Sequence, residues 1–325
     1  MTSAETLGLA PLVGDLERVE SRLLASVRHD DRFLAEVGAH LITAGGKRIR
    51  PTLTLCAAYA ACGTDAPARA DIVTGAAACE LVHLGSLHHD DVIDEAETRR
   101  GVPSVNARWS NIVAILSGDF LLARASSLAA SLGADVAALL ADTIGELCRG
   151  QVLELQHLYD VTRSEEDYTS AIEGKTASLF ATSCRVGGMV SRVDEPTLDA
   201  LTRYGHHLGL CFQIIDDILD LTADEETLGK PAGQDLVEGI YTLPVISALV
   251  EDASLADCLG GPLDHERRDE VRRRVAATGA VDATLAVAQD HATKANEALA
   301  GAHGLDDTVT DRLRTLVEGL VSRDR

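Results

Sequence analysis

Two clusters of aspartate share the DDxxD spacing, in which two carboxylates lie four residues apart. On a helix such carboxylates project from one face about one turn apart. They repel each other unless they face solvent or bind a divalent cation through their oxygens. A single cluster is more often a solvated face, but both of these lie in apolar sequence, LGSLHHDDVID and CFQIIDDILDL. The repeat therefore predicts facing walls of one polymetal site inside a helical bundle. The two clusters consist of Asp90, Asp91 and Asp94 and of Asp216, Asp217 and Asp220.

Basic residues near the first cluster could bind an anion held by the same metal ions. Mg²⁺ keeps waters and bridges carboxylates to substrate phosphates, so diphosphate is the ligand that two such clusters favour. Arg99 and Arg100 follow the first cluster, and Lys47, Arg48 and Arg50 precede a helix start, where free amides also favour anions. Taken singly, each basic group is equally consistent with an ordinary charged surface.

A lysine in the sequence Gly174-Lys175-Thr176 is a further candidate cation. The tripeptide resembles part of a nucleotide-binding loop, but Thr169 stands where a Walker A motif needs glycine and no strand precedes it. We interpret Lys175 as a cation on a helix that could reach a phosphate, or as an ordinary surface lysine.

Two polar residues share helix faces with the aspartates. His83 precedes Asp90 by seven residues, and Gln213 precedes Asp216 by three, so both could line the same cavity. Taken singly, each is more often a hydrogen-bonded core or surface residue.

A rival hypothesis uses two Glu-x-x-His pairs, which are the signature of di-iron carboxylate bundles. The pairs are Glu80 with His83 and Glu154 with His157. This site would leave both aspartate clusters and the basic loops without a role. A third hypothesis is a non-catalytic or regulatory subunit of the same fold, against which the intact acidic clusters argue.

The elements that position these residues are predicted to be helices. The chain has 325 residues, 46% of them hydrophobic but only 3% aromatic, and it carries no proline between residues 105 and 195. No repeat or linker marks a boundary, so we predict one all-α domain over 1–325. The expected helices span 33–43, 71–94, 106–132, 135–159, 165–190, 197–221 and 242–250, with a helical tail over 265–325.

Charge and cysteine usage exclude several classes of protein. A formal charge of -22 argues against a nucleic-acid partner, because such binding depends on lysine and arginine. The seven scattered cysteines contain no CxxC pair and suggest neither a disulfide framework nor a zinc site. No signal peptide and no run of about 18 uncharged apolar residues is evident, so we expect a cytoplasmic protein without a spanning segment.

In linear order these motifs resemble the trans-type polyprenyl diphosphate synthases, and the resemblance extends at least over 45–244. It is closest in look to the bacterial geranylgeranyl and long-chain members. The matching segments are GGKRIRP, HDDVIDEAETRRG, GD before LLARA, KT, FQIIDDILD and the following GK. The resemblance implies a homodimeric prenyltransferase that adds isopentenyl diphosphate to an allylic prenyl diphosphate. It further implies an all-α fold in which a single large helical bundle surrounds a deep central cavity. It also implies Mg²⁺ as cofactor, three ions with the diphosphate bound.

The resemblance assigns roles residue by residue. Metal-binding residues are Asp90, Asp94, Asp216, Asp217 and Asp220, with Asp91 in support. Allylic diphosphate would be held by Arg99, Lys175 and Lys230, and isopentenyl diphosphate by Lys47, Arg50, His83 and Arg100. Thr176 and Gln213 would stabilise the developing carbocation, so the catalytic set is Asp90, Asp91, Asp94, Lys175, Thr176, Gln213 and Asp216.

One segment departs from the family pattern. Where the family usually has G-K-x-T-L-P, this chain has GIYTLP over 239–244, with Ile240 in place of the lysine. One diphosphate contact is therefore expected to be missing, which predicts weaker allylic binding rather than inactivity.

Small residues before the first cluster bear on product length. The growing tail is expected to run toward the N-terminus of that helix, and Gly85 and Ser86 lie about one turn, roughly 6–7.5 Å, deeper than Asp90. Bulky aromatics at these positions stop growth early in the family. The sequence therefore predicts a product of geranylgeranyl length or longer, and it favours a long polyprenyl chain.

Overall fold

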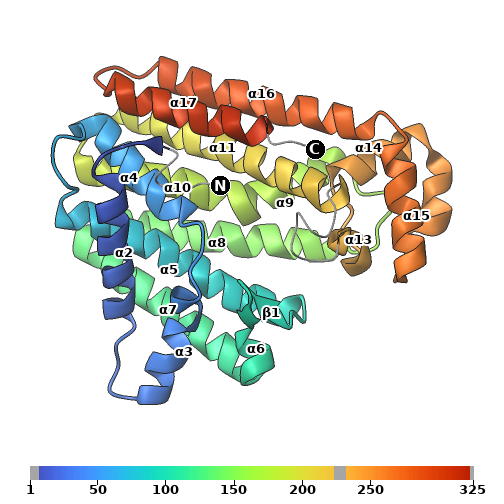
Figure 1. Ribbon diagram of the computed structural model, residues 1–325, viewed down its shortest axis with the longest axis horizontal. Helices are drawn as coiled ribbons and strands as arrows, with labels where there is room; N and C mark the ends of the chain where they lie inside the picture. The colour runs from blue at the N-terminus through green and yellow to red at the C-terminus, as the bar shows by residue number, and fades with distance from the viewer. Residues whose placement is uncertain (1–6, 223–231, 323–325) are drawn as a thin grey trace. The chain divides into compact units, whose positions relative to one another are not determined.

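The chain folds almost entirely into helices, which confirms the all-α prediction (Figure 1). The computed structural model describes residues 7–222 and 232–322. In that part of the chain, the strands are β1 (Thr98–Arg99) and β2 (Val102–Pro103), an antiparallel pair in which Thr98 faces Pro103. The helices are α2 (Leu12–Ser26), α3 (Arg32–Thr43), α4 (Ile49–Cys62), α5 (Ala70–Ile93), α6 (Val105–Arg108), α7 (Asn111–Leu132), α8 (Ala134–Gln156), α9 (Glu165–Ile172), the π-helix η1 (Glu173–Ala177), α10 (Ser178–Ser191), α11 (Glu195–Thr222), α13 (Gln234–Glu238), α14 (Leu243–Glu251), the 3₁₀ helix η2 (Ala253–Cys258), α15 (His265–Ala276), α16 (Ala280–Ala300) and α17 (Asp307–Val321).

The chain divides into two compact units. The first unit comprises 1–144, 179–205 and 301–313, and the second comprises 145–178, 206–300 and 314–325. Each unit is therefore built from three separate segments of the chain. The single domain over 1–325 stays a prediction.

Helix α5 is the centre of the first unit, where it packs against α7, α4 and α2. Residues 76–82 are at most 1% exposed, as expected for a helix that is apolar on nearly all sides. Burial of one leucine such as Leu81 contributes about 2 kcal/mol of transfer free energy. The C-terminal end of α5 carries the first aspartate cluster, so this cluster is attached to a well-packed core helix.

The second unit has its core around α14, α15 and α16. Leu236, Tyr241, Val245, Val271 and Val275 are all at most 2% exposed there. In the same unit the backbones of α8 and η1 touch: a Cβ at Gly150 would lie 2.3 Å from the amide nitrogen of Lys175. Only glycine permits this approach, and the π-helical turn that it contacts carries Lys175 and Thr176.

Two helix predictions differ from the structure. The helix predicted over 106–132 is broken at Trp109 and Ser110, because the Ser110 hydroxyl caps the amide of Val113 and starts α7. The helix predicted over 165–190 contains the π-helical η1 in its middle. The break before α7 and the π-helical turn both depend on specific contacts, which the spacing of apolar residues along the sequence does not reveal. The other expected helices are found close to their predicted bounds, and the tail forms α15, α16 and α17.

Among the described residues, α7 is the one helix long and apolar enough to cross a membrane by length and composition. It contains Asp119 and Arg124, and 39% of its most apolar stretch is buried within the protein. Core helices of globular proteins have the same composition, so this is weak evidence for a span. The exposed side chains of α7 include Ile112, Ile115 and Leu116.

Candidate functional site

The first aspartate cluster contains one buried and two partly exposed carboxylates. Asp91 is fully buried and its Oδ1 accepts a hydrogen bond from Arg99 Nε at 2.7 Å. Burial raises the pKa of Asp91, and the charge of Arg99 opposes that rise. Asp90 and Asp94 are partly exposed on the same helix end. Asp91 thus fixes the loop after α5 while Asp90 and Asp94 remain accessible to a ligand.

The loop after this cluster is held by local hydrogen bonds. Asn106 Nδ2 donates to the backbone carbonyls of Asp91 and Ala96, and Glu95 and Arg100 adopt positive φ angles of 50° and 55°. Non-glycine residues hold such angles only where the surrounding structure imposes them. Sequence reasoning missed Asn106, which belongs to no motif. An open, polar depression of about 620 Å³ lies beside the loop and is lined in part by Glu95, Glu97 and Asn106.

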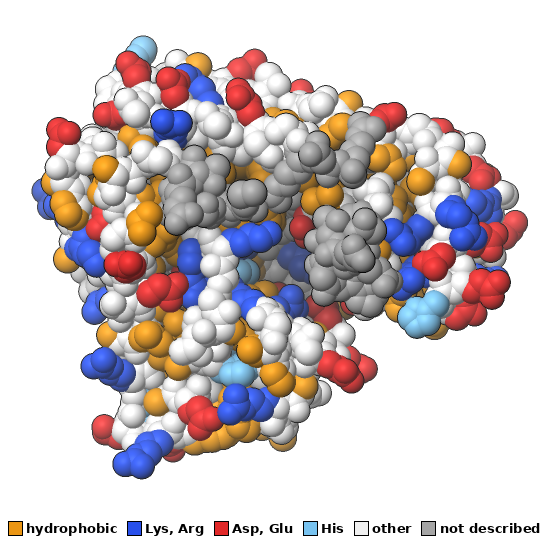
Figure 2. Space-filling model, viewed as in Figure 1, with side chains coloured by type: hydrophobic (Ala, Val, Ile, Leu, Met, Phe, Trp, Pro, Cys, Tyr) orange, Lys and Arg blue, Asp and Glu red, His pale blue; other side chains and the backbone are white. Residues whose placement is uncertain are grey.

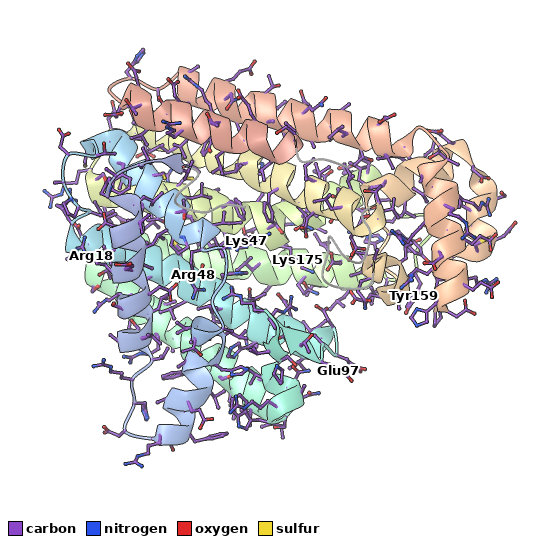
Figure 3. The ribbon with its side chains drawn as sticks, viewed as in Figure 1. Arg18, Lys47, Arg48, Glu97, Tyr159 and Lys175 are labelled. Atoms are coloured by element: carbon purple, nitrogen blue, oxygen red, sulfur yellow. The ribbon has the colours of Figure 1, made fainter. Side chains whose placement is uncertain are left out.

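Arg48 is turned into the protein rather than presented to a ligand (Figure 3). Its guanidinium contacts Glu20 and donates to Glu80 Oε1 at 2.8 Å and to the carbonyl of Ile42 at 2.9 Å. Burial lowers the pKa of Arg48, but the hydrogen bonds and charges of Glu20 and Glu80 outweigh that and raise it. The expectation that Arg48 belongs to a free basic loop is therefore corrected: it is a structural cation. Lys47 beside it is exposed.

The guanidinium of Arg100 lies against Gly45 and Gly46, the two glycines that precede α4. Its Nη1 donates to the carbonyls of Leu41 (3.1 Å) and Gly45, and its Nη2 lies 3.8 Å from Glu80 Oε1. A Cβ at Gly46 would lie 2.7 Å from Arg100 Cζ and would displace this guanidinium, and the φ of 140° at Gly46 also favours glycine.

Arg50 and His83 complete a basic cluster in the first unit. Burial lowers the pKa of Arg50 to about 10, with Glu80 opposing the shift and Arg100 adding to it. Burial and then the charges of Arg50 and Arg100 lower the pKa of His83 well below its usual value, so the imidazole is neutral at physiological pH. An anion bound here would meet fixed guanidinium groups and a neutral hydrogen-bonding histidine.

In the second unit, a chain of hydrogen bonds links the predicted polar residues. Thr176 Oγ1 donates to Gln213 Oε1 at 2.7 Å, Gln213 Nε2 donates to Asp217 Oδ1 at 2.8 Å, and the Tyr168 hydroxyl donates to Asp217 Oδ2 at 2.6 Å. Asp217 is 4% exposed, and burial raises its pKa to about 7. Sequence reasoning missed Tyr168, which belongs to no motif and lies 49 residues from its partner.

The two other aspartates of the second cluster differ in exposure. Asp216 is exposed and Asp220 is buried, with its Oδ2 accepting the amide of Asp235 at 3.3 Å. Lys175 forms an ion pair with Glu154, which is itself buried. Lys230, the third predicted allylic contact, lies outside the described residues.

The segment that departs from the family pattern is anchored by Arg163, a third residue that sequence reasoning missed. Its Nη1 donates to the Tyr241 carbonyl at 3.1 Å and its guanidinium lies 5.6 Å from the ring centre of Tyr168. The ring of Tyr159 packs against Gly239, where a Cβ would lie 2.5 Å from the ring (Figure 3). Ile240 is partly buried between these anchored residues.

The donor set suits magnesium bound together with a phosphate group. Among the described residues, no three histidine, cysteine, aspartate or glutamate side chains form a ready-made metal cage. Mg²⁺ does not need one, because it is commonly held by one or two carboxylates plus waters and phosphate oxygens. The buried Asp91 Oδ2 has no hydrogen-bond partner in the described part of the chain, so it can accept from a water in the shell of such an ion.

The di-iron hypothesis is not favoured by these contacts. Glu80 accepts from Arg48, Glu154 pairs with Lys175, and His157 Nδ1 lies 2.9 Å from Asp160 Oδ2. Three of the four side chains of the two Glu-x-x-His pairs are thus engaged with another side chain of the protein.

The two candidate chain-length residues have different surroundings. Gly85 is buried against α7, where a Cβ would lie 3.1 Å from the carbonyl oxygen of Gly118 and from the side chain of Leu122. Gly85 therefore has a packing role whatever the path of the product. Ser86 is partly exposed, and its hydroxyl donates to the carbonyl of His83 at 2.9 Å.

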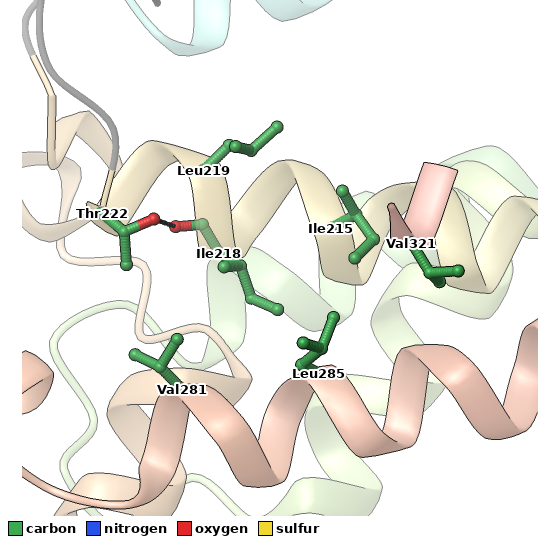
Figure 4. A pocket seen from close by; sticks show the side chains of 7 residues that line it. All are labelled: Ile215, Ile218, Leu219, Thr222, Val281, Leu285 and Val321. Carbon is green, nitrogen blue, oxygen red and sulfur yellow. Dashed lines mark hydrogen bonds between the residues drawn. The ribbon is translucent and has the colours of Figure 1, made fainter. Parts of the chain in front are cut away.

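A small apolar cavity in the second unit lies between α11, α16 and α17 (Figure 4). Its volume is about 40 Å³, and its lining includes Ile215, Ile218, Leu285 and Val321. Pockets for small organic ligands measure about 300–1,000 Å³. This cavity is thus too small for a prenyl tail.

On the face of the molecule seen in Figure 2, acidic and basic side chains are interspersed.

Comparison with known proteins gives a consistent result. The family model described as polyprenyl synthetase matches residues 31–277. Heptaprenyl diphosphate synthase component 2 of Geobacillus stearothermophilus is 40% identical over 95% of this chain and 91% of its own length. Nonaprenyl diphosphate synthase of Mycobacterium tuberculosis is 41% identical over 77% and 75%. A crystal structure of polyprenyl synthase from Caulobacter crescentus CB15, complexed with calcium and isoprenyl diphosphate, superposes with a TM-score of 0.90 at 34% identity, over 99% of this chain and 98% of that one.

Proposed function

Since the chain belongs to the polyprenyl synthetase family and is a prenyltransferase, we propose that it condenses isopentenyl diphosphate head-to-tail with an allylic prenyl diphosphate. The observation that carries the proposal is the pair of DDxxD clusters, each of which has a cation in its unit. Arg99 lies beside Asp91, and Lys175 precedes Thr176, which is linked by hydrogen bonds through Gln213 to Asp217. Relatives named heptaprenyl and nonaprenyl synthases support a long-chain product.

The aspartates would hold Mg²⁺ at the allylic diphosphate. Asp90, Asp94 and Asp216 are the proposed ligands, with Asp91, Asp217 and Asp220 as direct or water-mediated support. Three bound ions would neutralise the leaving diphosphate and so favour ionisation of the allylic carbon–oxygen bond. The calcium ion named with the Caulobacter relative supports a divalent-cation site.

Side chains would act on both substrates. Arg99, Lys175 and Lys230 would bind the allylic diphosphate, and the oxygens of Thr176 and Gln213 would stabilise the allylic cation. The isopentenyl double bond attacks that cation, a carbon–carbon bond forms, and a proton passes from the adduct to the departing diphosphate. Lys47, Arg50, His83 and Arg100 would hold isopentenyl diphosphate, the neutral imidazole serving as a hydrogen-bond donor.

Incubation with labelled isopentenyl diphosphate, MgCl₂ and geranyl, farnesyl or geranylgeranyl diphosphate tests the proposal. We expect an elongated prenyl alcohol after dephosphorylation, and its loss when EDTA removes the metal. Failure to extend any primer would contradict the proposal. Restoration of activity by a second, separately purified component would instead place this chain as one subunit, as the name of the Geobacillus relative suggests for that enzyme.

Product length gives a prediction at the position before the first cluster. Ser86→Phe is expected to shorten the product to about 15 or 20 carbons, because the ring would block the tail one helical turn from Asp90. Chromatography of the dephosphorylated products measures the change. Asp71→Phe, on the exposed first turn of the same helix, is the control and should leave the product unchanged. An unaltered product from Ser86→Phe would show that the tail runs elsewhere.

Gly85 is unsuited to the same test. A side chain there meets the Gly118 carbonyl and Leu122 at 3.1 Å, and overpacking costs about 1–3 kcal/mol. Alanine gains about 1 kcal/mol over glycine inside a helix, so Gly85→Ala should lower stability by up to about 2 kcal/mol. Urea unfolding of Gly85→Ala and of Ser86→Ala measures this. Equal stability of the two variants would contradict the close α5–α7 contact.

We further propose that the chain forms a homodimer in the cytoplasm, without a nucleic-acid partner, and meets membranes only through its lipid product. The exposed apolar residues Ile112, Ile115 and Leu116 on α7 support a surface covered by a second copy. Light scattering of the purified chain should give twice the mass of 34.3 kDa, and Leu116→Glu should reduce it. A monomer at micromolar concentration would contradict the dimer.

A further inference from the structure

We propose that Glu80 is a positioning residue for the isopentenyl diphosphate subsite and acts through Arg100 and Arg50. The inference rests on the proposed function, because it gives those two arginines a substrate to bind. Glu80 belongs to no binding motif of the chain, and its only sequence signal was the Glu-x-x-His spacing.

Glu80 is a buried carboxylate that lies against two guanidinium groups, those of Arg48 and Arg100. Its side chain is 1% exposed, with Arg48 Nη1 at 2.8 Å and Arg100 Nη2 at 3.8 Å from the same oxygen, Oε1. Arg50 is partly buried, and the charge of Glu80 opposes the lowering of its pKa by burial. His83 follows one helical turn later on α5, so Glu80 and His83 lie on the same side of that helix.

The positive charges of the three arginines repel one another. A carboxylate among them weakens this repulsion and also fixes where the guanidinium groups lie. Arg48 has a second carboxylate partner, Glu20, and the carbonyl of Ile42. Arg100 approaches Glu80 as an ion pair at 3.8 Å, whereas its hydrogen bonds within the described part of the chain go to the neutral carbonyls of Leu41 and Gly45. Glu80 is thus the anion that keeps Arg100 beside Arg48 and Arg50. The arrangement still carries excess positive charge, which an incoming diphosphate would offset.

The glutamine variant separates positioning from simple charge. Glu80→Gln keeps the shape of the side chain but loses its charge and one of its two acceptor oxygens. The NH₂ group that replaces this oxygen is a hydrogen-bond donor and cannot pair with a guanidinium, which also only donates. If Glu80 were only a background negative charge, its removal would tighten anion binding and lower the KM for isopentenyl diphosphate. If it positions Arg100, that KM rises.

Steady-state kinetics of Glu80→Gln tests this, with Glu20→Gln as the matched control. Glu20 pairs with Arg48 on the partly exposed side, whereas the carboxylate paired with Arg100 is Glu80. We expect Glu80→Gln to raise the KM for isopentenyl diphosphate about tenfold, with the allylic KM and kcat changed less than threefold, and Glu20→Gln to change each constant less than threefold. In calorimetry without allylic substrate, the Kd for isopentenyl diphosphate should rise in parallel.

Three outcomes would overturn the inference: an unchanged or lower KM for isopentenyl diphosphate, an equal rise in both KM values, or the same rise in Glu20→Gln. If Glu80→Gln does not fold, Glu80→Asp retains the charge but withdraws it by one methylene. Glu80→Asp should raise the KM for isopentenyl diphosphate and leave the allylic KM nearly unchanged. If the KM for isopentenyl diphosphate does not rise in Glu80→Asp, the proposal is equally refuted. Inactive wild-type protein would refute the proposed function instead, so the two failures are distinguishable.

Discussion

Asp90→Asn should lower kcat at least about 1,000-fold without unfolding the protein. The carboxylate is proposed to hold Mg²⁺ at the leaving diphosphate, and a neutral amide is a poor ligand for that ion. A loss of about 4 kcal/mol of transition-state stabilisation corresponds to this factor, since each 1.36 kcal/mol changes a rate tenfold. Asp90 is partly exposed at the end of a well-packed helix, so its own contribution to stability is small.

Elongation assays at saturating Mg²⁺ measure the loss, and thermal melting checks the fold. Asp71→Asn is the matched control, because Asp71 lies on the same helix with its side chain 42% exposed and should leave kcat unchanged. Activity of Asp90→Asn within tenfold of wild type would contradict the assignment of Asp90 as a metal ligand.

Asp217→Asn should make the metal-free protein more stable at pH 8 by about 2–4 kcal/mol and have little effect near pH 4. Burial raises the pKa of Asp217 to about 7 in the folded protein, against about 3.9 in an unfolded chain. The folded state therefore keeps a proton that the unfolded state releases, so stability falls as pH rises from about 4 to 7 and stays low above 7. Asparagine cannot ionise and so avoids the loss.

The variant also preserves the surrounding hydrogen bonds. The Tyr168 hydroxyl can rotate to accept from the asparagine amide, while the asparagine oxygen accepts from Gln213. Urea unfolding in EDTA at pH 4.5 and pH 8 measures the difference. Asp199→Asn on the exposed part of the same helix, α11, is the control and should show no such pH dependence. Equal stability of Asp217→Asn and wild type at pH 8 would contradict a buried, protonated carboxyl.

The positions of most helices followed from sequence alone because they depend on local periodicity. The helix expected over 71–94 is α5, Ala70–Ile93, and the one expected over 33–43 is α3, Arg32–Thr43. The same local rule placed each DDxxD cluster at the end of a helix. The break at Trp109 and Ser110 could not be predicted in this way, because a serine cap competes with a continuous apolar pattern.

Partners of the polar side chains were decided by the tertiary structure. Arg48 looked like one of three equivalent loop cations, but its guanidinium pairs with Glu80, 32 residues away. Asp217 is tied to Tyr168, 49 residues away, and Gly85 lies against Gly118. The sequence by itself determined the all-α class, the family and the residue types available for metal and diphosphate chemistry. Only the fold decided which cations are structural and which carboxylates are buried, because desolvation and pairing depend on groups brought together from distant parts of the chain.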